Sequence, residues 1–144
     1  MAIAIISTNT TAIGTAATIS VAGDDLYLVE GVRLVSTEGY GVNVTASDTT
    51  THIDGAVIAA SRAFATDFGI SARLFVGETG SVTSFESTSS EAGIVLFGTC
   101  SLLDNRGLIS SPECIGSYLS GSFSEVVNTG SISGTTGIQL ASGG

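Results

Sequence analysis

The sequence predicts an all-β fold, a parallel β-helix (β-solenoid) of about five turns with 23–27 residues each. Short apolar segments recur on both sides of a glycine along most of the 144-residue chain. Gly, Ser, Thr and Ala dominate the rest, which suits short strands joined by tight corners of positive φ and lowers helix propensity. One such turn cannot bury its own apolar face, so neighbouring turns must stack on it. The pivot glycines, which recur once in each period, are Gly31, Gly55, Gly80, Gly107 and Gly130.

An apolar segment precedes the first repeat. We expect residues 1–22 to form an N-terminal capping or donor strand, and residues 23–144 to form the solenoid repeats. Residues 1–6 are apolar, but they lack the basic region that opens a signal peptide. Because no apolar stretch reaches the ~18 residues of a membrane span, we expect no membrane insertion.

Each repeat places one short apolar strand before its pivot glycine and another directly after it. A second glycine follows each pivot at a varying distance, which indicates a corner loop of changeable length. Residues 56–65 are the only helix candidate, and we interpret them as a strand followed by a loop. The period also fits leucine-rich repeats, but the leucine spacing and a helical periodicity are missing. The second glycines are Gly41, Gly69, Gly93, Gly116 and Gly137.

Stacked turns align equivalent side chains into ladders. Val82 and Ile109 each lie two residues after a pivot glycine, so we expect them to stack inside the solenoid. Asn105 and Asn128 each lie two residues before a pivot, where they would stack as an amide ladder at the corner. Glu78 holds the same position in the third repeat, so we expect it to break a continuous ladder of asparagines.

The two cysteines, Cys100 and Cys114, lie within one repeat period of each other. They are either small buried hydrophobic side chains or a disulfide that closes one turn of the solenoid. A disulfide would indicate an oxidising compartment, and both interpretations stay open. One histidine and two distant thiols do not provide a zinc site, so we expect no metal ion and no cofactor.

Charge is scarce and mostly acidic. The chain has 13 Asp and Glu residues, four Arg and no Lys, which gives a formal net charge of −9. Such a surface repels phosphate groups, so we expect neither nucleic acid nor an anionic membrane as a partner. An acidic surface is compatible with divalent cations such as Ca²⁺ outside the cell.

Catalytic chemistry finds little support in the sequence. The single histidine, His52, alternates with Asp54, and we expect a solvated side chain on the outer face. No G-x-S-x-G motif is present, and the acidic residues are scattered over different repeats without a recurring pair. We therefore assign no catalytic or cofactor-binding residue, and keep a glycan-processing β-helix enzyme as a remote alternative.

Residues 102–111 (LLDNRGLISS) and 126–140 (VVNTGSISGTTGIQL) carry a recognisable pattern. They resemble the I-x-N-x-G-x-I-x-G repeats of secreted bacterial β-solenoids, which occur in autotransporter passengers and in N-terminal regions of large RTX-like, hemolysin-type proteins. The resemblance implies a structural or adhesive role outside the cell or at its surface. The calcium-binding nonapeptide of RTX proteins is absent. The most similar segment, at residues 23–25, occurs only once. The resemblance therefore does not imply calcium-dependent folding.

The last repeat runs to Leu140 without a charged or helical cap. We therefore expect the chain to pair head to tail with copies of itself, as a structural subunit of an extracellular filament or surface layer. The alternative is an N-terminal module of a larger secreted adhesin that binds cell-surface glycans. Its contacts would come from the corners at residues 84–91 and 110–117, and from Tyr40, Phe85 and Tyr118.

Overall fold

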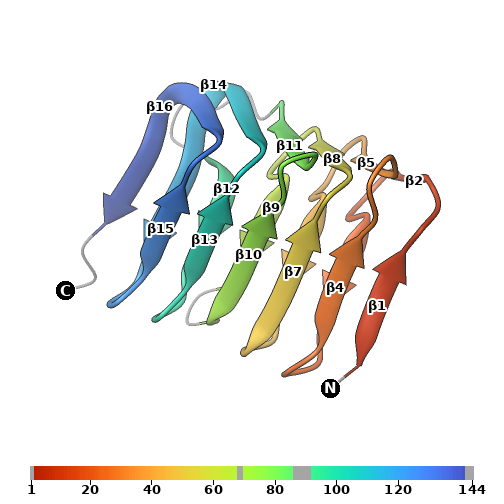
Figure 1. Cartoon of the computed structure of the whole chain (residues 1–144), viewed down its shortest axis with the longest axis horizontal. Helices are drawn as coiled ribbons and strands as arrows, with labels where there is room; N and C mark the ends of the chain where they lie inside the picture. Colours follow the sequence, from red (N-terminus) through yellow and green to blue (C-terminus); the bar gives the residue numbers. More distant parts are fainter. Residues whose placement is uncertain (1, 68–69, 86–91, 142–144) are drawn as a thin grey trace.

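The computed structural model describes residues 2–67, 70–85 and 92–141, in which every helix or strand is a β-strand. The strands wind into six turns of a parallel β-solenoid, and each turn passes over three faces of the stack. Figure 1 shows the first face, on which six strands lie side by side from one end of the stack to the other. The predicted fold class is therefore confirmed.

The three faces are built from strands that recur in the same order in each turn. The first face consists of β1 (Ile3–Ile6), β4 (Asp25–Leu28), β7 (Thr49–Ile53), β10 (Ala72–Val76), β13 (Leu102–Asn105) and β15 (Glu125–Asn128). The second consists of β2 (Thr10–Ala12), β5 (Arg33–Ser36), β8 (Ala56–Ala59), β11 (Ser81–Ser84) and the first parts of β14 (Leu108–Ser120) and β16 (Ser131–Ala141). The third consists of β3 (Ala17–Ile19), β6 (Val42–Val44), β9 (Phe64–Thr66), β12 (Ala92–Leu96) and the later parts of β14 and β16.

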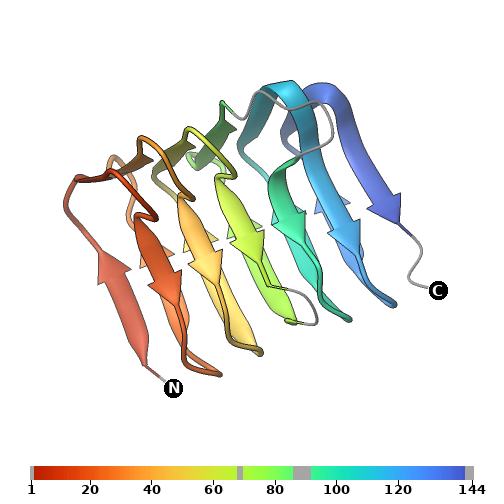
Figure 2. The ribbon, with the colours of Figure 1, turned by 180° about the vertical axis from the view of Figure 1, so that it is seen from behind.

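Successive turns differ in length, yet their strands stay in parallel register. Along the first face, the sequence separation between paired residues is smallest from Ile3 to Asp25 and largest from Arg73 to Leu102. Residues 1–22, predicted to form a capping or donor strand, contain the strands of the first turn, β1–β3. These strands pair in register with β4–β6. Figures 1 and 2 show β1 and β16 at opposite ends of the stack.

The pivot glycines all lie in the first corner, between the first and second faces. A Cβ atom on Gly80 would lie closer than 3.0 Å to the carbonyl oxygen of Ile53, and one on Gly107 would approach the Gly80 carbonyl oxygen as closely. Real Cβ atoms do not come this near to backbone atoms, so only glycine fits. Positive φ, which the composition suggested as the reason for corner glycines, applies among the pivots only to Gly31, at 78°.

The first corner of the first turn has no glycine. Asn9 lies there instead, and its side-chain Oδ1 accepts a hydrogen bond from the Arg33 backbone N–H at 2.8 Å. In the third to sixth turns, the pivot glycine is in close contact with the corner of the turn before it. No described turn lies before β1–β3, so the same constraint does not act on Asn9. The glycine spacing therefore revealed five repeats, whereas the structure has six turns.

The second glycine column lies where the chain enters the third face. Val42 pairs with Phe64, so the residue that stacks on Gly41 is Ala63. Gly69, which the sequence predicted as the second glycine of this turn, lies outside the described residues. The later members of the column are Gly93, Gly116 and Gly137.

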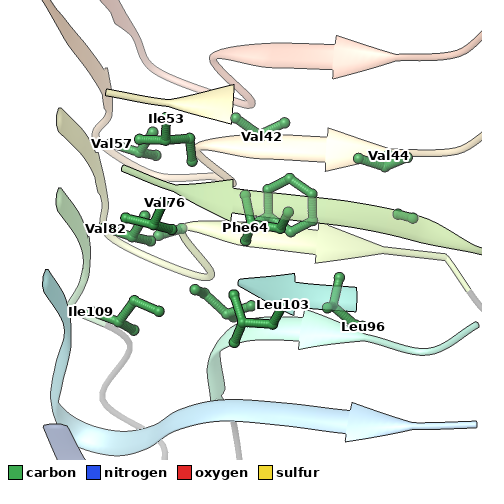
Figure 3. Close-up of a cluster of buried hydrophobic side chains, with 14 of the residues drawn as sticks. Val42, Val44, Ile53, Val57, Phe64, Val76, Val82, Leu96, Leu103 and Ile109 are labelled. Carbon is green, nitrogen blue, oxygen red and sulfur yellow. The ribbon is translucent and has the colours of Figure 1, made fainter. Parts of the chain in front are cut away.

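Inward side chains stack into columns, and the columns form one apolar core (Figure 3). Val82 pairs with Ile109, and both are buried, as their spacing from the pivots predicted. Residues 56–65 contain β8 and the corner that leads into β9, so the strand interpretation is confirmed for this segment. Because every inward column is extended by each new turn, a turn in the middle of the stack is covered on both sides.

We predict that Gly107→Ala destabilises the fold by about 1–3 kcal/mol, because the added methyl group must push two turns apart. Gly14→Ala is the matched control, since a Cβ there would meet nothing within 4 Å. The control should leave the stability unchanged or raise it by up to about 1 kcal/mol. Urea unfolding followed by circular dichroism measures both changes. Equal stabilities of the two variants would contradict the close-contact explanation of the first corner.

Candidate functional site

The last turn of the solenoid leaves apolar side chains uncovered. Leu140 stacks on Leu119 in one inward column, but Leu119 is 1% exposed and Leu140 is 63% exposed. Ile138 stacks on the buried Ser117 and is 39% exposed. Since each pair shares a column, the difference arises because no further turn among the described residues covers the sixth. We call this surface, formed by Val126, Ile132, Ile138 and Leu140, the C-terminal end face.

Both ends of the stack present strand edges. Within the described ranges, β15 pairs only with β13 and β16 only with β14, while β1, β2 and β3 pair only with β4, β5 and β6. One edge of each end strand therefore points its N–H and C=O groups away from the stack. Proteins commonly protect such edges with charged side chains. Glu125 is the single charged residue in these five end strands.

The opposite end of the stack carries mostly small inward side chains. Ala4, Ala12 and Ala17 hold inward positions of the first turn and are exposed or half-buried. A hollow of about 200 Å³ lies beside Ala4, with Ile19 and Leu26 in its wall. We call this surface, formed by Ala4, Ile6, Thr10, Ala12, Ala17 and Ile19, the N-terminal end face.

Asn105 and Asn128, the residues predicted to form a corner ladder, lie side by side at the end of the first face. Asn105 Nδ2 donates a hydrogen bond to Asn128 Oδ1 at 2.7 Å. The register places Val76 next to Asn105 in this column, so the assignment of Glu78 to it was wrong. The first corner is longer in the fourth turn than in the turns on either side, and Glu78 lies in that corner.

In the buried Asn105 amide, only the nitrogen forms hydrogen bonds with described residues. The side chain is 0% exposed, and its Oδ1 has no hydrogen-bond partner in the described structure. Its Nδ2 also donates to the backbone oxygens of Gly107, at 3.4 Å, and Ser131, at 3.2 Å. This position is therefore suited to a donor and unsuited to an anion.

The two cysteines, both described by the structure, are not joined by a disulfide. Cys100 lies exposed in the corner before β13, with a positive φ of 58°. Cys114 is buried within β14, which fits the interpretation of a small hydrophobic side chain. The thiols therefore give no indication of the redox compartment.

The outer side of the first face carries a column of rings. His52 lies between Tyr27 and Phe75, with ring centroids 5.9 Å and 4.8 Å apart, and it is stacked on Phe75 at an interplanar angle of 9°. The Tyr27 hydroxyl donates a hydrogen bond to Asp54 Oδ2, and this bond raises the pKa of Tyr27. His52 does face outward, but it is half-buried between two rings and not freely solvated as predicted.

A hollow of about 250 Å³ lies along this ring column, over the ends of β7, β10 and β13. Asp104 follows Phe75 in register, and its Oδ2 lies 3.2 Å from Arg106 Nη2. The hydrogen bonds to Asp104 raise the pKa of the Arg106 guanidinium, which stays charged. No local pattern in the sequence marks these residues as a group, because the rings lie a whole turn apart along the chain and only the register brings them into one column.

The side chains predicted as glycan contacts do not form one site. Phe85 is 58% exposed next to β11, whereas Tyr40 and Tyr118 are half-buried on other parts of the stack. Residues 86–91 of the first predicted corner lie outside the described residues. Residues 110–117, the second predicted corner, are part of β14, which bends from the second face to the third.

Within the described ranges, no group of three or more His, Cys, Asp or Glu side chains could hold a metal ion. The described part of the chain also contains no helix long and apolar enough to cross a membrane. Comparison of the chain with protein-family models, with curated proteins and with solved structures gave no significant match. The fold defines the class, a parallel β-solenoid, and its function has to be argued from its surfaces.

We predict that Asn105→Asp destabilises the fold increasingly as the pH rises from about 4 to 8. Burial beside two backbone oxygens would raise the pKa of the new carboxyl above its ordinary value. The native state would then hold a proton that the unfolded state releases, so stability falls as the pH rises through this range. Asn128→Asp, at an exposed position of the same column, is the control. Parallel pH profiles of the two variants in urea unfolding would refute the prediction.

Proposed function

We propose that the protein is an extracellular structural subunit that assembles head to tail into a filament or surface layer. The observation that carries the proposal is the exposure of Leu140 and Ile138 in columns that are buried one turn earlier. Apolar side chains that stack on a core and remain open to water favour a partner that continues the core.

The two end faces are complementary in side-chain size at two positions. A second copy that continues the stack by one turn in register would place Val126 opposite Ala4. In the same arrangement Ile138 would lie opposite Ala17, and its larger side chain would fill the space that the alanine leaves. The pairing joins different faces of the two copies, and because each copy continues the stack along the same axis, repetition produces an open filament and not a ring.

The unprotected strand edges support the same proposal. Monomeric β-proteins commonly block their edges with charged side chains, proline or a covering element. The five end strands contain one charged residue, Glu125, and no proline. Edge-to-edge pairing with another copy would satisfy the backbone groups of these strands in the same parallel pattern that joins the turns within the chain.

The proposed location outside the cell is supported by the acidic, lysine-free composition and by the resemblance of residues 126–140 to secreted repeats. The alternative, a module of a larger adhesin, would have its C-terminal end face covered by a further turn of its own chain. These two functions differ in whether the 144-residue chain forms polymers or stays monomeric when it is alone in solution.

We predict that the 144-residue chain forms polymers and that Leu140→Glu abolishes them, because a charge on the C-terminal end face opposes burial. The substituted side chain is already 63% exposed, so the fold itself should tolerate the change. Leu108→Glu is the matched control, since Leu108 is 44% exposed on the side of the stack. Light scattering and electron microscopy measure assembly. A wild-type chain that stays monomeric over a wide concentration range would refute the proposal and favour the adhesin module.

We further predict that Ala4→Glu, on the N-terminal end face, also yields monomers. A mixture of the Ala4→Glu and Leu140→Glu chains should form heterodimers and nothing larger, because one intact face of each kind remains. Analytical ultracentrifugation measures the species present. Homodimers of either variant alone would show that like faces pair, and would contradict head-to-tail assembly.

A further inference from the structure

The ring column on the outer side of the first face ends at Phe75. One side of the Phe75 ring is stacked on His52, and the strand on its other side carries Asp104 in register. Asp104 has no ring with which to continue the column. The side of the Phe75 ring that points toward β13 therefore borders the hollow of about 250 Å³ that opens there.

Polar groups stand at both ends of this hollow. Asp54 borders it in the third turn, and Arg106 borders it in the fifth. At the spacing of neighbouring strands, a separation of two turns corresponds to about 10 Å. Gly77 lies between them and has no side chain, and a Cβ atom there would collide with Asp54 Oδ1. The Asp54 carboxylate therefore lies over Gly77, and hydrogen-bonding groups stand at both ends of the hollow.

The hydrogen-bonding groups at the two ends are held in place and keep unused capacity. Tyr27 donates its hydroxyl to Asp54 Oδ2. Arg106 uses Nε and one Nη atom for Asp104, which leaves other guanidinium N–H groups available as donors. The Asp104 side chain is 14% exposed and Arg106 61%, and the hydrogen-bonded pair presents its acceptors and donors to the hollow.

We propose that this hollow binds one neutral hexopyranose unit of a glycan. The apolar C–H side of the sugar ring would stack on Phe75 and so continue the ring column. Sugar hydroxyls would donate to Asp104 and accept from Arg106 at the rim. Sites for drug-sized ligands usually measure roughly 300–1,000 Å³, so a hollow of 250 Å³ suits a single ring.

The charges select a neutral sugar over an acidic one. Asp54, Asp104 and Arg106 together carry one net negative charge, and the whole chain carries −9. A uronic or sialic acid would be repelled by this field. The hollow lies on the side of the stack, away from both end faces, so sugar binding does not depend on head-to-tail assembly.

The test is saturation-transfer NMR of the 144-residue chain with methyl glucoside, methyl galactoside, methyl mannoside and glucuronate, because this measurement tolerates large assemblies. We expect weak binding of at least one neutral methyl glycoside, with saturation concentrated on the C–H protons of one side of its ring. Glucuronate should bind more weakly than the matching glucoside. No transfer to any of the neutral glycosides at their solubility limit, or tighter binding of glucuronate, would overturn the proposal.

Two substitutions locate the site. Phe75→Ala should lower the affinity about tenfold or more, since it removes the stacking surface. Phe85→Ala is the matched control, because it removes an equally large ring that is 58% exposed elsewhere, and it should leave the affinity unchanged. Arg106→Ala, at a position whose side chain is 61% exposed, should also weaken binding by about tenfold. Equal effects of the Phe75 and Phe85 variants, or wild-type affinity of the Arg106 variant, would refute the assignment of the hollow.

Discussion

The close approach of successive turns at the first corner is the constraint on which the other features of this solenoid depend. From the third turn onward, each pivot glycine lies against backbone atoms of the turn before it. The carbonyl oxygens of Gly55, Gly80 and Gly107 each accept a hydrogen bond from a backbone N–H of the next turn, at 2.9–3.0 Å. This contact keeps the turns at the spacing of paired strands and holds equivalent residues in register, whatever the length of the loops elsewhere.

Register then determines which side chains become neighbours. Strand residues alternate between the inside and the outside, so each position belongs to one column throughout the stack. The inward columns form the apolar core, and they also hold buried polar members such as Asn105, whose Nδ2 donates a hydrogen bond to the neighbouring Asn128. The same stacking acts on the outer side, where Tyr27, His52 and Phe75 become neighbours although they lie in three different turns.

A fold held together by columns is incomplete wherever a column stops. At the C-terminal end face the inward columns stop, and apolar side chains that would be buried in a longer stack meet water. On the outer side the ring column stops at Asp104, and a hollow with one aromatic wall remains. The proposals of head-to-tail assembly and of sugar binding have this common origin, although they concern separate surfaces and can succeed or fail independently.

The sequence by itself determined the fold class, the five corner glycines and the stacking of Val82 on Ile109, because these features repeat with the period of the turns. Only the tertiary structure decided the register. It showed that Val76 and not Glu78 stacks on Asn105, that Ala63 stacks on Gly41 in the second column, and that the first turn, whose first corner has no glycine, belongs to the stack. The physical reason is that corner loops vary in length, so distance along the chain does not determine which residues face each other. Pairing between strands determines it, and pairing also assembles the rings around His52, which no local pattern marks.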